Sequence, residues 1–377
     1  MKIMHLSDLH LGRRIKEFSM LEDQSFILRE ISDIADREEP DVIVIAGDVY
    51  DKAVPSAEAV QLFDHFLVEN AEKSRKFLII SGNHDSPERI AFGGRLMETS
   101  GVFFSPVYDG EVTPVSLEDA YGSVNFYMLP FIKPVHVRRY FPEEETDSYT
   151  DAVRTAIRHM EIDPAARNVL ITHQFVTGAQ RSESEELSVG GADNVDVSVF
   201  RPFDYTALGH IHGPQNITDT VRYCGTPLKY SFSEAGQQKS VTITELGTKG
   251  SLNIRTVPLE PLHDMRVISG TYLEVTARDF YAGTDTDDYL QVTLKDEEDI
   301  PCAVSRLRAV YPNVMGLTYD NCRTRAGSVI TEEVPAEKMP PLELFADFYR
   351  KQNNAPMTEE QRDFVADLIE KIGEEYR

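Results

Sequence analysis

Short apolar runs rich in Val and Ile alternate with segments of helical spacing along the first half of the chain. The runs predict buried strands at residues 2–7, 42–46, 77–81, 125–129, 169–172 and 205–208. Apolar positions that recur at helical spacing between the runs predict helices at residues 21–37, 56–70, 87–99 and 150–160. This alternation is typical of βαβ units, so we expect a layered α/β fold in which β sheets are flanked by helices.

The pattern changes in the second half of the chain. Residues 240–257 form short alternating β segments with Gly-rich turns, which predict a hairpin that closes a first domain over residues 1–260. Residues 261–334 have strand and helix signals of their own, enough for a small α+β domain. The stretch VPAEKMPP then predicts a linker at residues 335–341, because it has three prolines in eight residues.

Two amphipathic helices are expected in the tail, residues 342–377. Their apolar stripes consist of Leu342, Phe345, Phe348 and Tyr349 in the first helix and of Phe364, Val365, Leu368, Ile369 and Ile372 in the second. A pair this short cannot bury two apolar stripes by itself. It either packs onto its own parent domain or docks on another protein, and the proline linker favours the second alternative.

Composition limits the class of protein. With 377 residues and 41% hydrophobic content, the chain is long and apolar enough for a sizeable core. No apolar run approaches the roughly 18 residues of a membrane helix, and no signal peptide is recognisable, so a cytoplasmic protein without a membrane span is expected. The three cysteines show no CxxC spacing, which favours reduced thiols over disulfides or a structural zinc site.

The formal net charge of -25 points away from nucleic acid, because phosphate binding normally depends on clustered Lys and Arg. Much of the excess lies in the acidic runs 143–147, 183–186 and 296–299. The simplest interpretation of these runs is solvated loops that keep the protein soluble.

Polar side chains of a narrow range of types follow five of the predicted strands. They are Asp8 and His10, Asp48, then Asn83, His84 and Asp85, then His173, and finally His210 and His212. A single histidine or Gly-Asp pair at a strand end is usually structural. However, the carboxyl ends of parallel strands form the crevice in which α/β proteins bind ligands, so we expect these groups to converge. Together their nitrogen and oxygen donors suffice for two divalent metals.

The chemistry expected of such a centre is phosphoester hydrolysis. Asp48 is the candidate bridging ligand, because a carboxylate has lone pairs for two cations. The cations would clamp a phosphate, acidify a bound water and stabilise the charge that develops during displacement. His84 is the candidate proton donor to the leaving alkoxide, with Asp85 orienting it; the alternative role for His84 is an outer group that orients the phosphate.

The motifs SDLHLGR (7–13), GDVYD (47–51), SGNHDS (81–86), YTALGHIHGPQ (205–215) and YCGTPLKYSFSE (223–234) resemble a known family. With His173, they are similar to the calcineurin-like metallophosphoesterases and, within these, to the nuclease subunits of bacterial SbcCD complexes. The broader resemblance covers the first domain, and the narrower one covers nearly the whole chain.

The resemblance implies a DNA exonuclease and endonuclease of repair and recombination with two Mn²⁺ ions, Mg²⁺ being an alternative. One ion would be bound by Asp8, His10, Asp48 and His212, and the other by Asp48, Asn83, His173 and His210. His84 falls where the family has its catalytic histidine. Residues 261–334 would be a capping domain that helps to contact DNA.

The resemblance also implies partners. The tail helices would bind an SbcC-type coiled-coil ATPase, and helices around residues 18–30 and 56–70 would form a homodimer within a heterotetramer. No Walker A motif occurs in the chain, so ATP dependence would come from the partner.

Two cations would add positive charge in the cleft, which reconciles DNA binding with the acidic chain. Basic residues near the motifs would assist, namely Arg13, Arg14, Lys16, Arg138, Arg139 and Lys229. Even so, we expect weak intrinsic DNA affinity. The alternatives are a hydrolase of small phosphodiesters and a non-enzymatic scaffold. Arg181 and the loop SVGGADNV are equally compatible with a substrate-facing loop and with a plain connector.

Overall fold

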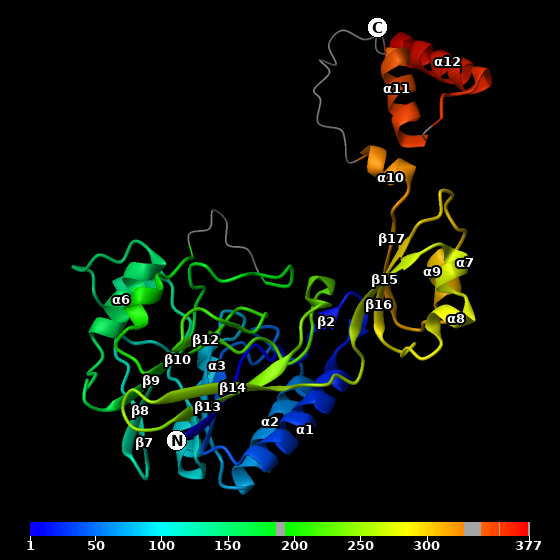
Figure 1. Cartoon of the computed structure of the whole chain (residues 1–377). Helices are drawn as coiled ribbons and strands as arrows, with labels where there is room; N and C mark the ends of the chain where they lie inside the picture. The colour runs from blue at the N-terminus through cyan, green and yellow to red at the C-terminus, as the bar shows by residue number, and fades with distance from the viewer. Residues whose placement is uncertain (186–192, 328–340, 354, 376–377) are drawn as a thin grey trace. The chain divides into compact units, whose positions relative to one another are not determined.

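The computed structural model describes residues 1–185, 193–327, 341–353 and 355–375, which form two compact units, Met1–Asp264 and Met265–Arg377 (Figure 1). The linker expected at residues 335–341 lies, apart from its last residue, outside the described residues. Within the described ranges, no helix has the length and apolar character needed to cross a membrane.

Two six-stranded sheets form the first unit. The first sheet has the order β14 (Leu252–Pro258), β13 (Ser240–Leu246), β1 (Lys2–Leu6), β4 (Val42–Ala46), β5 (Lys76–Ile80) and β6 (Val102–Phe104). The second has the order β11 (Gln215–Asn216), β12 (Val221–Tyr223), β10 (Tyr205–Gly209), β9 (Arg167–His173), β8 (Gly122–Leu129) and β7 (Val115–Asp119). The neighbours β1, β4, β5 and β6 are parallel, and so are β8, β9, β10 and β12.

The main core lies between the two sheets. Val44 and Leu78 of the first sheet pack in one cluster with Phe126, Ile171 and Tyr205 of the second, and all five are fully buried. Burying one such side chain contributes about 1.5–3 kcal/mol to stability. The predicted apolar runs are therefore strands of a sandwich, buried on both faces because helices cover the outer sides.

Helices flank this sandwich. In Figure 1, α1 (Leu21–Glu38) and α2 (Ala57–Glu72) run side by side, and they contact each other. On the second sheet, α6 (Tyr149–Arg158) places Val153 and Ala156 in one cluster with Leu170 and Leu208. The layered fold expected from the sequence is thus present. Shorter elements of this unit are β2 (Arg14–Ile15), β3 (Phe18–Ser19), α5 (Pro134–Arg138), η2 (Val197–Phe200) and η3 (Phe232–Glu234).

The single helix predicted at residues 87–99 is wrong. The segment instead forms α3 (Pro87–Ile90), α4 (Gly94–Met97) and the 3-10 turn η1 (Glu98–Ser100). Gly93 interrupts the helix, because its φ of 75° is left-handed and does not continue a right-handed helix.

The second unit contains a parallel sheet of β15 (Met265–Gly270), β16 (Tyr289–Leu294) and β17 (Val314–Tyr319). Leu290, Val292 and Leu294 of the central strand form its core with Val275 and Leu307 from the helices. Val275 belongs to α7 (Tyr272–Val275) and Leu307 to α9 (Ala303–Leu307). The other helices of the unit are α8 (Arg278–Tyr281), α10 (Cys322–Gly327), α11 (Pro341–Asn353) and α12 (Glu359–Glu375).

Candidate metal centre

The candidate ligands meet where parallel strands of both sheets end. Asp8 and His10 follow β1, Asp48 follows β4 and Asn83 follows β5, whereas His173 ends β9 and His210 and His212 follow β10. Backbone bonds join the loops after β1 and β4, since the N–H groups of Asp8 and His10 donate to the carbonyls of Gly47 and Asp48 at 3.0 Å. The seven predicted ligands therefore converge as expected from the strand order.

Several of these residues have unusual backbone conformations. Asp8, His10 and Asp48 have φ values of 53°, 45° and 50°, and His210 has φ of 101°. Left-handed conformations cost energy for residues other than glycine and are concentrated at functional sites. These turns direct side chains from adjacent strands toward a common point.

Asp8, His10 and His212 form one group of possible metal ligands, with one donor atom of each lying within 4.8 Å of the others. All three side chains are buried. The Nε2 atoms of His10 and His212 face each other at 3.2 Å, and the Nδ1 of His10 has no hydrogen-bond partner among the described residues. Two facing imidazole nitrogens share at most one proton when both rings are neutral, so at least one lone pair is available to a cation.

The second group surrounds Asn83. Its Oδ1 lies 3.0 Å from Nε2 of His173 and 2.9 Å from Nδ1 of His210. The Oδ2 of Asp48 lies 3.3 Å from the same His173 nitrogen. Asp48 also belongs to a possible ligand group with Asp8 and His173 and to another with His10 and His84. It therefore lies between the two groups, where a bridging carboxylate is needed.

Glycines make room for these ligands. A Cβ on Gly82 would lie 2.1 Å from Oδ1 of Asp48, and one on Gly47 would lie 2.4 Å from Nδ1 of His173. The close approach of backbone to side chain packs the donors tightly. The mixture of carboxylate, amide and imidazole donors suits divalent transition metals, whereas Mg²⁺ prefers oxygen alone. The residues present thus fit a pair of divalent metals.

Electrostatics couple the buried groups. Burial opposes ionisation of Asp48, but the charge of His173 and its hydrogen bond outweigh it and hold the Asp48 pKa well below its usual range. Burial also opposes the charged form of His173, but the negative charge of Asp48 and its hydrogen bond outweigh this effect and raise the pKa of His173 to about 9. Burial raises the pKa of Asp8 to about 6 and lowers that of His210 to about 3. Without metal, a proton on His173 therefore compensates the charge of Asp48.

His84 differs from the other histidines of the centre. Its side chain is 19% exposed, whereas those of His10 and His173 are fully buried. Its Nδ1 lies 3.1 Å from the carbonyl oxygen of Asp51, and its Nε2 lies 4.0 Å from Oδ2 of Asp48. The ring is thus held at the edge of the centre with Nε2 directed toward the ligands.

Asp85 does not orient His84 in the described structure. Its buried carboxylate instead accepts hydrogen bonds from three backbone N–H groups, those of Gly82, Val49 and Tyr50, at 2.9–3.1 Å. It therefore fastens the loop after β5 to the loop after β4. The backbone carbonyl of Asp51 makes the contact with His84 that we expected from Asp85. Every residue has a backbone carbonyl, so the sequence could not indicate this partner.

Several of the basic residues near the motifs are engaged by carboxylates. Arg13 pairs with Asp51 at 3.2 Å, Arg138 with Asp147 at 2.9 Å, and Lys229 with Asp264 at 2.8 Å. Their contribution to a positive surface is therefore smaller than the sequence suggests. The three cysteines are free thiols, as expected.

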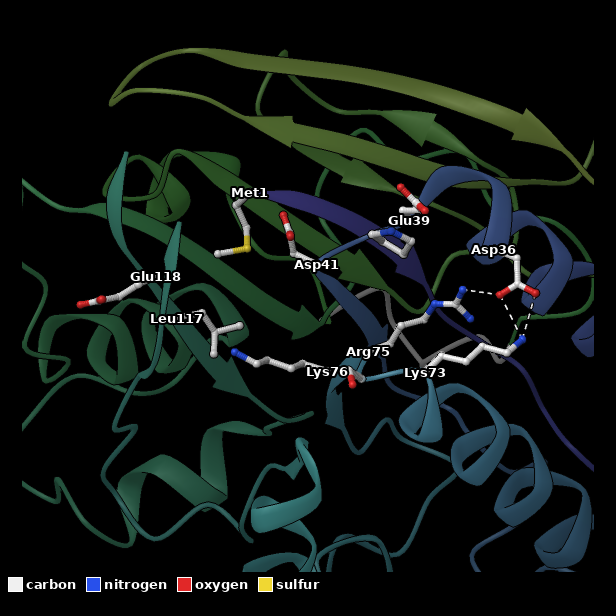
Figure 2. A pocket seen from close by; sticks show the side chains of 11 residues that line it. Met1, Asp36, Glu39, Asp41, Lys73, Arg75, Lys76, Leu117 and Glu118 are labelled. Atoms are coloured by element: carbon white, nitrogen blue, oxygen red, sulfur yellow. Dashed lines mark hydrogen bonds and ion pairs between the residues drawn. The ribbon is translucent and has the colours of Figure 1, made fainter. Parts of the chain in front are cut away.

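A polar cavity lies at the other end of the first sheet, where residues just before β4 and β5 line it (Figure 2). Its basic residues Lys73 and Arg75 both form ion pairs with Asp36, the first at 2.9 Å. Because the ligands lie at the carboxyl ends of the strands, this cavity is separate from the metal centre. Its internal ion pairs indicate a structural network.

Comparisons with known proteins agree with this geometry. A family model of calcineurin-like phosphoesterases matches residues 1–214, and one of the type 5 capsule protein repressor C-terminal domain matches residues 261–353. The chain is 31% identical over 380 residues to SbcD, the D component of the SbcCD nuclease, from Staphylococcus epidermidis, with 99% of each chain covered.

A dimetal phosphatase from Danio rerio is a more distant structural neighbour. It has 10% sequence identity and a TM-score of 0.38, covering 69% of this chain and 98% of the other, too little to support an argument. The family models and the curated relative suffice: the chain belongs to the calcineurin-like phosphoesterases, a family of hydrolases, and within them to the SbcD family of SbcCD nucleases.

Proposed function

We propose that this chain is a metal-dependent DNA nuclease that hydrolyses phosphodiester bonds at a two-metal centre. It would act as a double-strand exonuclease and as an endonuclease on single strands and hairpins, in DNA repair and recombination. The observation that carries the proposal is the convergence of seven residues with nitrogen and oxygen donors, Asp48 among them. The curated relative, named a nuclease and aligned over nearly its full length, supports the same chemistry.

Asp8, His10 and His212 would bind one metal, and Asn83, His173 and His210 the other, with Asp48 shared. Two Mn²⁺ ions fit this mixed donor set, and Mg²⁺ is the alternative. When bound, such a pair supplies Lewis acidity, an activated water and a positively charged clamp for the phosphate. The protein contributes the fixed positions of the donors, because five of the seven side chains are buried, Asn83 and His210 being partly exposed, and closely packed backbone encloses Asp48 and His173.

His84 would be the proton donor to the leaving oxygen. As an imidazolium it donates Nδ1–H to the carbonyl of Asp51 and retains an Nε2–H for transfer. After the transfer the Nδ1 bond still orients the ring. The partial exposure of the side chain suits a group that must meet a substrate.

Access to DNA would depend on a partner. The chain has a net charge of -25, and Arg13, Arg138 and Lys229 are paired with carboxylates. The isolated chain should therefore bind duplex DNA weakly and lose this binding as salt is raised. The second unit would act as the capping domain that helps to contact DNA.

The two tail helices are the proposed docking site for an SbcC-type ATPase. Phe345 and Phe348 of α11 are 42% and 57% exposed, and Phe364 of α12 is 69% exposed. Exposed aromatic side chains on an amphipathic helix are typical anchors for a partner. We further propose a homodimer within a heterotetramer that works on the nucleoid in the cytoplasm.

A nuclease assay with metal analysis tests the function. Purified protein with Mn²⁺ should release nucleotides from blunt duplexes and open hairpins, and an SbcC-type partner with ATP should stimulate both reactions. A chromogenic phosphodiester is the control for a small-molecule hydrolase. Turnover of the small substrate without cleavage of DNA, in the presence of the partner, would refute the proposal.

A further inference from the structure

We propose that Ser184 and Glu234 are positioning residues that hold His212 in the tautomer whose Nε2 is free to bind a cation. The inference rests on the metal centre proposed above. It assigns a role to Ser184 and Glu185 of the acidic run 183–186, which the sequence analysis interpreted as a solvated loop. That interpretation is wrong for Glu185, which is buried.

Ser184 joins His212 to a buried acid. Its Oγ lies 2.6 Å from Nδ1 of His212 and within hydrogen-bond distance of Oε1 of Glu234. Glu234 lies in η3 and has no exposed surface. The three side chains come from different parts of the chain, and they form a line that leads from the interior to the ligand.

A buried cation keeps Glu234 ionised. Lys239 is 4% exposed, and its Nζ donates to Oε2 of Glu234 at 2.6 Å and to the carbonyl of His212 at 2.9 Å. Burying an ion pair is costly and seldom improves stability over apolar residues. Such a pair directly behind a candidate ligand therefore indicates a role at the site.

The charge of Glu234 determines the tautomer. A carboxylate only accepts hydrogen bonds, so the single proton of the Ser184 hydroxyl is donated to Glu234. The same oxygen then accepts from His212, which requires the proton of the ring to be on Nδ1. Nε2 is left with a lone pair, and this atom faces His10 in the ligand group that also contains Asp8.

The next residue secures the backbone of the same ligand. Oε1 of Glu185, which is buried, accepts from the N–H of His212 at 2.7 Å. Arg13 in turn donates to the carbonyl of Ser184 at 3.3 Å while pairing with Asp51. Residues 184–185 therefore clamp His212 at both its ring and its backbone.

The test compares Ser184→Ala with Ser182→Ala in the full-length protein. Ser182 is the same residue type, two positions away. Its hydroxyl contacts Glu234 and the Ser184 hydroxyl, but the described structure shows no hydrogen bond between it and His212. Ser184→Ala should weaken Mn²⁺ binding by about 10- to 100-fold at one of two sites, as measured by calorimetry and electron paramagnetic resonance. Ser182→Ala should change it by less than about threefold, and Ser184→Thr, which keeps the hydroxyl, should restore it.

A second measurement uses the metal-free protein. Long-range ¹H–¹⁵N spectra of histidine-labelled protein should show His212 protonated at Nδ1, and Ser184→Ala should convert part of it to the other tautomer. Glu234→Gln should do the same, because an amide no longer requires the serine proton.

The outcomes separate the two proposals. Unchanged Mn²⁺ affinity and tautomer in Ser184→Ala, in a wild type that binds two Mn²⁺, would overturn this inference alone. A wild type that binds no Mn²⁺ would overturn the metal centre and this inference with it. Loss of binding in Ser184→Ala and Ser182→Ala alike, with lowered melting temperatures, would show a structural role and also overturn it.

Discussion

The two halves of the metal centre are built differently. In the half contributed by the first sheet, left-handed turns and backbone bonds between neighbouring loops position Asp8, His10 and Asp48 just after their strands. In the half contributed by the second sheet, His173, His210 and His212 depend on distant groups: the carbonyl of Ala46 lies 2.8 Å from Nδ1 of His173, and Ser184 bonds to His212.

This difference indicates how the centre is assembled. The half from the first sheet depends on contacts within that sheet, because Asp85 ties the loop after β5 to the loop after β4. The imidazole half acquires its geometry only when the sheets pack together. Substitutions in the first-sheet half should therefore remove ligands or loop contacts. Substitutions where the two sheets pack together should disturb the fold and the centre at once.

Asp48→Ala should have the largest effect, because Asp48 is the ligand that we propose the two metals share. We expect loss of both metals and a fall in the hydrolysis rate of about 10³-fold or more, measured by metal analysis and a nuclease assay. The same change at Asp219, which is exposed between β11 and β12, is the control. Two bound metals in Asp48→Ala would show that metal binding does not require Asp48 as a shared ligand.

His84→Ala tests whether the exposed edge of the first half serves the reaction or the metals. Hydrolysis should fall by about 10²-fold with both metals retained, since only proton donation is lost. His159→Ala, at an exposed position just beyond α6, should leave the rate unchanged. Because His84 lies within reach of His10 and Asp48, loss of a metal in His84→Ala would identify it as a ligand.

Gly209→Ala tests the junction between the sheets. A Cβ there would lie 1.9 Å from the carbonyl oxygen of Ala46 in β4 and 2.7 Å from Nδ1 of His173. We expect the free energy of unfolding to fall by about 2–3 kcal/mol, as measured by denaturant titration. Gly236→Ala, which has no atom within 4 Å of the new Cβ, should be neutral. Equal free energies of unfolding for the wild type and Gly209→Ala would mean that the two sheets can move apart at this point without loss of stability.

Metal addition should give the smallest effect. A metal that binds only the folded state stabilises it by about 1.4 kcal/mol per site when the free metal concentration is tenfold above Kd. The melting temperature should therefore rise when Mn²⁺ is added and fall when a chelator removes it. Asp48→Ala should show no such rise. A wild-type melting temperature that is independent of Mn²⁺ would contradict the coupling of the two halves by metal.

Much of the centre could be predicted from the sequence because each ligand directly follows an apolar run. Asp8, Asp48 and Asn83 were recognisable in this way, and so were His173 and His210. The predicted helix at 87–99 failed where Gly93 adopts a left-handed conformation. The role of Asp85 could not be predicted, because two of its three partners are backbone N–H groups of a loop more than thirty positions away.

The sequence by itself determined the strands, most of the helices and the ligand types, because these depend on local periodicity and on the chemistry of individual side chains. Only the tertiary structure decided that the strands form two sheets, which polar side chains lie near Asp48, and that Ser184 and Glu234 lie behind His212. The physical reason is range: these features arise from packing between segments far apart in the chain, and local pattern carries no information about such contacts.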